Sequence, residues 1–177
     1  MVNIATRSAT AEDLDRITEI YRPAVVSGTA SFELDPPNEA EMRRRYDAIM
    51  SAGFPYLVAV KDNTVAGYAY ANAYRPRPAY RFTVEDSIYV DPAFHGLGIG
   101  RKLLDQLISL TTDMGFRQMI AVIGDSAQQP SIRLHRNAGF QFAGTLHAIG
   151  YKHDRWLDGV LMQRSLGPGD TAPPTHT

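Results

Sequence analysis

Three glycines at alternate positions, Gly96, Gly98 and Gly100, separate an apolar segment from a segment with helical periodicity. Because glycine has no Cβ, the backbone of such a turn can approach a ligand closely. The amides that open the following helix have no acceptor within that helix, and such amides bind anions. The turn therefore predicts an anion site, although a lone glycine-rich turn is more often only a tight connection. It lacks both the P-loop spacing and the acidic residue of a dinucleotide site.

A second candidate site is a cluster of three arginines, Arg75, Arg77 and Arg81, which lie among Tyr74 and Tyr80 in a proline-containing segment. A guanidinium group matches a carboxylate with two parallel hydrogen bonds, so the cluster suits a clamp for an anionic substrate. The alternative is a solvated loop whose arginines have no specific partner. Taken alone, the segment favours the solvated loop.

The composition restricts the domain organisation and the partners. The chain has 177 residues and is 44% hydrophobic, which suits one domain with a sizeable core, and we assign residues 1–166 to it. Residues 167–177 are rich in glycine, proline and threonine, so we expect a flexible tail. The formal net charge of -1 provides no basic field to hold nucleic acid or an anionic membrane.

The chain has no cysteine, which excludes disulfides, thiolate metal sites and a cysteine nucleophile. Its first residues show no basic region that leads into an apolar one, and no apolar run is long enough to cross a bilayer. We therefore expect a cytoplasmic protein without a membrane partner or a metal.

The elements that must position these groups follow from apolar periodicity and from turn residues. We expect helices that begin near Thr10, Asn38, Gly100 and Pro130. The expected strands cover residues 3–7, 56–60, 65–71, 87–90, 119–123, 142–149 and 157–163. The strand, helix and strand order around the glycine turn predicts that residues 87–90 and 119–123 form a parallel pair.

These elements together resemble the GNAT superfamily of acetyl-CoA-dependent N-acetyltransferases. The turn from His95 to Gly100 is similar to the Gln/Arg-x-x-Gly-x-Gly/Ala signature of that family, with His95 as a departure at the first position. The resemblance implies a mixed α+β fold with a central, mostly antiparallel, twisted sheet and helices on both faces. It also implies that one splayed parallel strand pair holds acetyl-CoA, whose pyrophosphate is bound by main-chain amides of the turn.

A closer likeness, over residues 3–166, is to phosphinothricin and methionine sulfoximine acetyltransferases. The matching segments are Phe32 to Pro36, Thr83 to Glu85, Ser87 to Val90, Val122-Ile123, Pro130 to His135, Gly139-Phe140 and Arg155 to Asp158. Gln128 stands where those enzymes often have asparagine. The likeness implies acetyl transfer to the α-amine of a small amino acid or analogue, by direct attack in a ternary complex. It also implies a homodimer, because family members often form their pocket across one.

The resemblance also assigns roles to single residues. An amine attacks a thioester only as the free base, so a proton acceptor is needed, and Glu85 matches that position, although read alone it would be a solvated strand-edge residue. His135 matches a position where many GNAT enzymes keep a tyrosine proton donor; the alternative is a histidine on the helix surface. The residues expected to bind acetyl-CoA are Ser87, Ile88, Tyr89, Val90, His95, Gly96, Leu97, Gly98, Ile99, Gly100, Arg101, Gln128 and Ser131. Those expected around the acceptor are Phe32, Tyr74, Arg75, Arg77, Tyr80 and Glu85.

Two other functions stay open at this stage. The acceptor of an acetyltransferase can be a polyamine, an aminoglycoside or a protein N-terminus, but a polycation calls for an acidic pocket, which the arginine cluster disfavours. A sensor module that binds coenzyme A without catalysis is expected to lack the base, and Glu85 argues against it.

Overall fold

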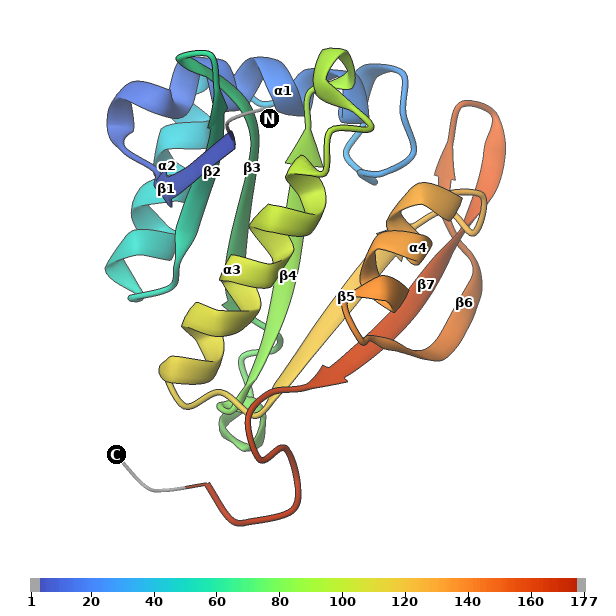
Figure 1. Ribbon diagram of the computed structural model, residues 1–177. Coiled ribbons are helices and arrows are strands. Elements are labelled where there is room, and N and C mark those ends of the chain that lie inside the picture. The colour runs from blue at the N-terminus through green and yellow to red at the C-terminus, as the bar shows by residue number, and fades with distance from the viewer. Residues whose placement is uncertain (1–3, 175–177) are drawn as a thin grey trace.

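A computed structural model describes residues 4–174, which form a seven-stranded mixed sheet with flanking helices (Figure 1). The strand order is β1-β2-β3-β4-β5-β7-β6, and only β4 and β5 pair in parallel. The strands are β1 (Ile4–Ser8), β2 (Tyr56–Lys61), β3 (Thr64–Ala73), β4 (Thr83–Val90), β5 (Gln118–Gly124), β6 (Gln141–Lys152) and β7 (Arg155–Ser165). The helices are α1 (Leu14–Val26), α2 (Glu39–Ser51), α3 (Ile99–Asp113) and α4 (Gln129–Asn137). This architecture confirms the predicted fold class; Asn3, the expected start of the first strand, lies outside the described residues.

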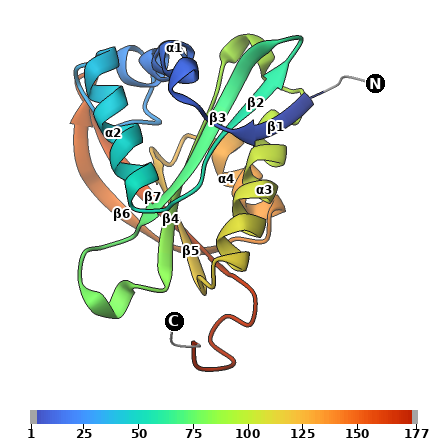
Figure 2. The ribbon, with the colours of Figure 1, turned by 90° about the vertical axis from the view of Figure 1, so that its left-hand side faces the viewer.

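The helices cover both faces of the sheet because each has one apolar side. In Figure 2, α1 and α2 lie on one side of the sheet and α3 and α4 on the other. Leu103, Leu104 and Leu107 of α3 are fully buried in one core, and Leu14 and Ile17 of α1 are buried in the second. The spacing of three and four residues places these side chains on one face of each helix.

The parallel pair lies earlier in β4 than the sequence suggests. Residues Thr83 to Asp86 of β4 pair with Gln118 to Ala121 of β5, and the pairing stops there. The expectation that residues 87–90 pair with β5 was therefore wrong: these residues pair with β3 alone, while β5 remains paired with β7 to its last residue. Figure 1 shows β4 and β5 diverging beyond this point. The result is an opening in the middle of the sheet.

The glycine turn begins where β4 ends. Asp91 accepts a hydrogen bond from the Ala93 amide (2.8 Å), and Pro92 follows, which cannot donate to a strand ladder. A short 3₁₀ turn (Pro92–Phe94) then leads to Gly98, which precedes α3 with a positive φ of 80°. The turn therefore stands directly at the opening between β4 and β5.

The last described residues pack against the body of the molecule. Leu166 is buried, and Arg117 donates to the carbonyls of Gly169 (3.2 Å) and Pro173 (2.9 Å). Residues 175–177 lie outside the described part, so the flexibility of the tail stays a prediction, as does the domain boundary at 166. Within residues 4–174, no helix has both the length and the apolar character that crossing a membrane requires.

Candidate functional site

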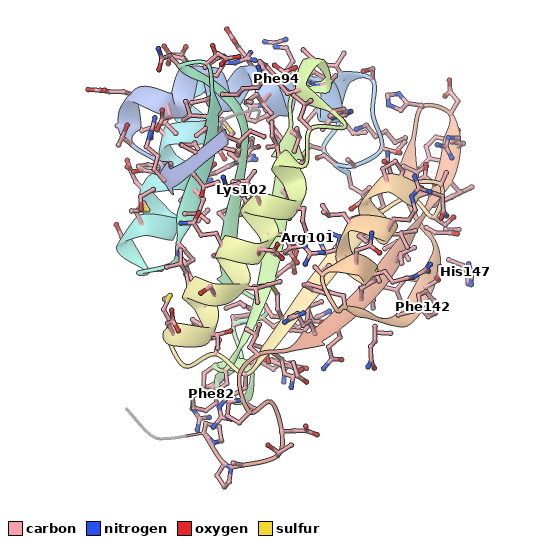
Figure 3. The ribbon with its side chains drawn as sticks, in the orientation of Figure 1. Phe82, Phe94, Arg101, Lys102, Phe142 and His147 are labelled. Carbon is pink, nitrogen blue, oxygen red and sulfur yellow. The ribbon has the colours of Figure 1, made fainter. Side chains whose placement is uncertain are left out.

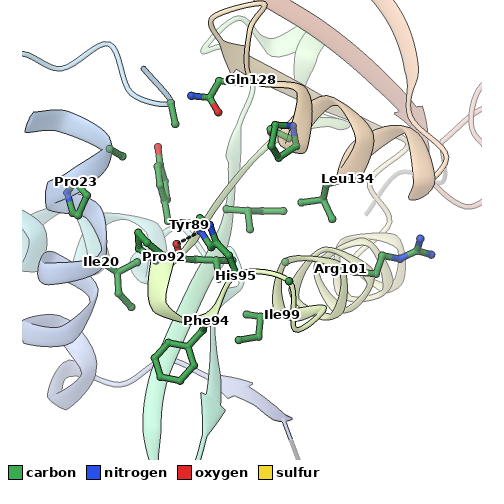
Figure 4. Close-up of a pocket in the computed structure, with 18 of the residues that line it drawn as sticks. Ile20, Pro23, Tyr89, Pro92, Phe94, His95, Ile99, Arg101, Gln128 and Leu134 are labelled. Carbon is green, nitrogen blue, oxygen red and sulfur yellow. Dashed lines mark hydrogen bonds between the residues drawn. The ribbon is translucent and has the colours of Figure 1, made fainter. Parts of the chain in front are cut away.

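A cavity of about 630 Å³ lies at the opening between β4 and β5 (Figure 4). Its walls come from α1, the end of β4, the glycine turn, the start of α3 and the start of α4. A smaller cavity, of about 60 Å³, continues it deeper between the two strands, and both cavities are lined by Ile88, Gln128 and Ser131. The smaller cavity also touches Asp86 and His135. We call this smaller space the strand gap.

The main-chain groups at the end of β4 face the strand gap without a strand partner. The Asp91 amide donates to the carbonyl of Ala66 on β3 (2.9 Å), which shows that odd-numbered residues here turn their main-chain groups toward β3. Consecutive residues of a strand alternate, so Ile88 and Val90 turn theirs toward β5. Because β4 pairs with β5 only as far as Asp86, the Ile88 and Val90 amides are available to an extended ligand.

The glycine turn presents amides to the same cavity. Gly96 and Gly98 both have a φ near +80°, a conformation that side-chain-bearing residues adopt only with strain. His95 ties the turn to β4, because its Nε2 lies 3.0 Å from the Val90 carbonyl, as Figure 4 shows. The α3 amides that follow have no acceptor in their own helix, so the turn suits an anion.

Most of the residues predicted to bind acetyl-CoA line the large cavity. The exceptions are Ser87, which lines the strand gap, and Leu97, which is not among the lining residues of either space. Like His95, two of these side chains have protein partners outside the turn: Gln128 Nε2 donates to Thr29 Oγ1 (3.0 Å), and Arg101 Nη1 donates to the Asn137 carbonyl (2.8 Å). Arg101 points toward α4 in Figure 3.

The sequence did not predict the wall that α1 contributes. Ile20, Pro23 and Ala24 line the large cavity from α1, and Leu134 lines it from α4. Pro23 lies inside the helix, which nevertheless continues to Val26. The only sequence signal was this proline within a helical pattern, and nothing in it indicated contact with the glycine turn.

Glu85 lies near the middle of β4, close to the point where the two strands separate. Asp86 points toward α4, so its neighbour Glu85 points to the opposite face, which α1 and α2 cover. Burial raises the pKa of Glu85, the Asp86 charge raises it further, and Arg75 lowers it by a smaller amount. A carboxylate whose pKa is raised in this way is better matched to taking a proton near neutral pH.

His135 is buried, contrary to the alternative of a histidine on the helix surface. Its side chain is 5% exposed and its Nε2 lies 3.0 Å from Asp86 Oδ2, whose side chain is 2% exposed. Its Nδ1 lies 2.8 Å from the Ser131 carbonyl. Burial lowers the pKa of His135, but the hydrogen bond and charge of Asp86 outweigh burial, so the net shift is upward. Sequence analysis did not predict the Asp86 contact.

The residues predicted around the acceptor are only partly brought together. The Arg75 guanidinium stacks on the Tyr74 ring at 5.1 Å, and Tyr80 packs edge-on against Tyr74 at 5.6 Å. The Arg75 charge also lowers the pKa of Glu85, as the smallest of the effects on that group. Arg77 is exposed in the same loop, and none of these residues lines the large cavity.

Phe32 belongs to a separate wall, the loop of residues 27–37 between α1 and α2. Its ring fills the space beside Gly124 and Gly150, where an added Cβ would lie 3.0 Å from the ring. The loop is held by polar contacts that sequence analysis missed. Lys152 Nζ donates to the Ser31 carbonyl (2.8 Å), and Arg45 Nη1 donates to Glu33 Oε1 (2.6 Å).

The arrangement can hold a ligand that has an anionic group at the glycine turn and an extended, amide-containing chain along β4. Among residues 4–174, no group of three or more histidine, aspartate or glutamate side chains is placed to hold a metal ion. Residues 14–140 match the Acetyltransferase (GNAT) family. The chain belongs to this acetyltransferase family. It is an acetyl-CoA-dependent N-acetyltransferase, and its co-substrate is acetyl-CoA.

Several known proteins are similar to this GNAT enzyme over nearly their whole length. A phosphinothricin N-acetyltransferase from Alcaligenes faecalis is 52% identical, with 92% of this chain and 83% of the relative covered. An L-methionine sulfoximine/L-methionine sulfone acetyltransferase from Salmonella typhimurium is 40% identical, with 90% and 93% covered. The crystal structure of a phosphinothricin acetyltransferase from Sinorhizobium meliloti in complex with AcCoA superposes with a TM-score of 0.95. That protein is 52% identical, and the match covers 98% of this chain and 94% of the other.

Proposed function

We propose that this enzyme transfers the acetyl group of acetyl-CoA to the α-amine of a small amino acid or analogue of the phosphinothricin or methionine sulfoximine type. The observation that carries the proposal is Glu85, a half-buried carboxylate with a raised pKa, next in the chain to Asp86 of the strand gap and within the field of Arg75. The names of the similar enzymes support this acceptor class.

Acetyl-CoA supplies the activated acyl group, and the chain supplies its binding sites. The amides at the end of the glycine turn and at the α3 N-terminus would bind the pyrophosphate, because the first amides of a helix have no acceptor within it. The main-chain groups of Ile88 and Val90 would hydrogen-bond the pantetheine arm like an added strand. One of these amides would also donate to the thioester oxygen and so stabilise the negative charge that develops on it.

Glu85 would take the proton of the acceptor ammonium, directly or through a water, so that the free amine attacks. Arg75 would bind the acceptor carboxylate, since a guanidinium offers two parallel donors. His135 would return a proton to the coenzyme A thiolate as it leaves. Glu85 and His135 point to opposite faces of the sheet, which separates the proton acceptor from the proton donor.

The test is release of free coenzyme A with phosphinothricin, methionine sulfoximine, methionine sulfone, spermidine and an aminoglycoside as acceptors. We expect turnover with the first three. Glu85→Gln should lower kcat by about 10²- to 10⁴-fold with acetyl-CoA binding intact, which calorimetry measures. Glu39→Gln, at an exposed position of α2, is the matched control. Turnover of Glu85→Gln within twofold of wild type at every pH would reject Glu85 as the base.

Arg75→Ala tests the acceptor clamp. Loss of a hydrogen-bonded charge pair costs about 1.5–3 kcal/mol, so KM for acceptors with a carboxylate should rise about 10- to 150-fold. KM for simple amines should not change. Arg43→Ala, at an exposed position of α2, is the control. An equal rise for both acceptor classes would reject the clamp.

The enzyme is also proposed to be a homodimer. Large apolar side chains on β5, β6 and β7 are 44–64% exposed, namely Val122, Phe142, Leu146, Ile149, Tyr151 and Trp156. A monomeric protein rarely exposes so many large apolar side chains. The residues predicted around the acceptor also do not line the large cavity of this single chain. Figure 3 shows Phe142 and His147 on the outer side of β6.

Sedimentation equilibrium tests the dimer. Trp156→Glu, at a position 64% exposed, should shift the protein toward monomer, whereas Met114→Glu, at a position 47% exposed on the end of α3, should not. A monomeric wild-type protein at micromolar concentration would contradict the dimer. We also propose a cytoplasmic location, where acetyl-CoA is available as the acyl donor.

A further inference from the structure

The contact between Asp86 and His135 lies on the wall of the strand gap, and the reaction as proposed so far makes no use of Asp86. The two residues are 49 positions apart in the chain, and both side chains are almost completely buried. The number of protons on a buried histidine and carboxylate in contact is restricted, because a net charge on the buried pair would be costly.

The partners of the ring fix this proton count. A carbonyl only accepts hydrogen bonds, so Nδ1, which lies 2.8 Å from the Ser131 carbonyl, carries a hydrogen. Nε2 lies 3.0 Å from Asp86 Oδ2, and a single proton between these two atoms satisfies both. The pair therefore holds one transferable proton and is neutral overall. Because Nδ1 is committed to Ser131, this is the proton that the pair can give away.

The second oxygen of Asp86 gives the pair a route to the strand gap. Asp86 Oδ1 is buried and has no hydrogen-bond donor among residues 4–174. The adjoining cavity, about 60 Å³, is large enough to admit water. Water bound to Oδ1 would also reach the side of Ile88, where the pantetheine arm is proposed to lie. The remaining wall of the gap is apolar or main-chain, apart from Ser87, Gln128 and Ser131.

We infer that Asp86 is a positioning residue of the acetyl transfer: it holds His135 doubly protonated at the strand gap, so that the pair protonates the departing coenzyme A thiolate through water. This inference rests on the proposed function. The carbon–sulfur bond breaks with its electron pair on sulfur, and sulfur takes the proton of the pair. Glu85 passes the ammonium proton to solvent before the attack and then takes the second proton, which the nitrogen loses as the amide forms. The pair regains its proton from solvent after coenzyme A has left.

The charges around His135 make the expected pH dependence specific. The charged side chain that contacts the His135 ring is Asp86, on β4. The other contacts are neutral: the Ser131 carbonyl, in the same helix as His135, and the Phe140 ring, which packs edge-on at 5.0 Å. Glu85 points to the other face of the sheet. Replacing the Asp86 carboxylate with an amide keeps a hydrogen-bonding group of the same shape, but it removes the charge that stabilises the imidazolium.

The experiment compares Asp86→Asn with Asp113→Asn, which makes the same change at an exposed position near the far end of α3. For Asp86→Asn, we expect kcat to fall about 10- to 100-fold with KM for acetyl-CoA unchanged. The alkaline limb of kcat against pH should move down by about one unit or more, because His135 loses its proton earlier. Asp113→Asn should retain the wild-type profile.

Two further measurements separate this role from a structural one. Asp86→Asn added to His135→Gln should cause no further loss of kcat, because Asp86 acts through His135. NMR titration of the His135 ring, identified by its loss in His135→Gln, should show a lower pKa in Asp86→Asn, and it requires no turnover. Thermal unfolding reports whether each variant is folded.

The inference is overturned if folded Asp86→Asn keeps the wild-type alkaline limb and a kcat within twofold, or if the His135 titration is unchanged. It is also overturned if the two substitutions multiply in kcat, because Asp86 would then act independently. Failure of the proposed function looks different: no amino acid analogue would be acetylated by the wild-type enzyme, while the NMR shift caused by Asp86→Asn would persist.

Discussion

The glycine turn offers the sharpest prediction about acetyl-CoA binding, because its glycines differ in conformation. Gly98 has a φ of 80° and open space around the position of an added Cβ. Gly100 has no positive φ, and an added Cβ would lie 3.3 Å from a Leu134 methyl group, which can move. Alanine at Gly98 is therefore strained by backbone conformation alone, whereas alanine at Gly100 suits the helix that it starts.

The left-handed conformation costs an alanine about 1–2 kcal/mol. If the free turn relaxes to avoid this cost, acetyl-CoA must restore the turn on binding. One tenfold step corresponds to about 1.4 kcal/mol, so Kd for acetyl-CoA should rise about 5- to 30-fold in Gly98→Ala. Gly100→Ala should bind within about threefold of wild type, because it asks only for a shift of a few tenths of an ångström in a side chain.

Gly115 provides a matched control for the strain itself. It follows α3 with a φ of 88° and, like Gly98, has nothing within 4 Å of an added Cβ, but it does not line the cavity. Isothermal titration calorimetry with acetyl-CoA should therefore separate Gly98→Ala from Gly115→Ala, although both lose stability. Equal Kd values for these two variants, or a weaker Kd in Gly100→Ala than in Gly98→Ala, would refute the reasoning.

Three further predictions concern stability and the cavity walls. Gly124→Ala places a Cβ 2.5 Å from the Thr29 carbonyl, so it should lower Tm and raise KM, whereas Gly144→Ala, which has open space, should leave Tm and KM unchanged. Lys152→Met removes two hydrogen bonds, from Nζ to the carbonyls of Ala24 and Ser31 at the loop of residues 27–37, and faster amide hydrogen exchange in that loop should report the loss. The Arg7 hydrogen bond lowers the pKa of Asp13, so its stabilisation is present above the ordinary carboxyl range and is lost as pH falls through the lowered pKa. The free energy of unfolding of Asp13→Asn, measured with urea, should therefore be about 1 kcal/mol below wild type at pH 7 and converge with it in acid; a gap that persists at low pH would contradict this.

The sequence alone determined those features of the fold that depend on residues close together in the chain. Asp91 and Pro92 end β4, the glycines shape the turn, and the spacing of Leu103, Leu104 and Leu107 defines the buried face of α3. Each of these depends on a residue and its neighbours within one or two turns of chain. The strand, helix and strand order also predicted a parallel pair correctly, because crossover connections have one favoured topology.

Tertiary structure decided where that pair comes apart and which side chains meet there. Residues 87–90 have the composition of a paired strand, and nothing in them records that β5 leaves after Asp86 to follow β7. The same holds for His135, whose burial and contact with Asp86 join positions 49 residues apart. Periodicity reports which face of an element is apolar, but a buried polar contact depends on which other element covers that face, and only the packed chain specifies this.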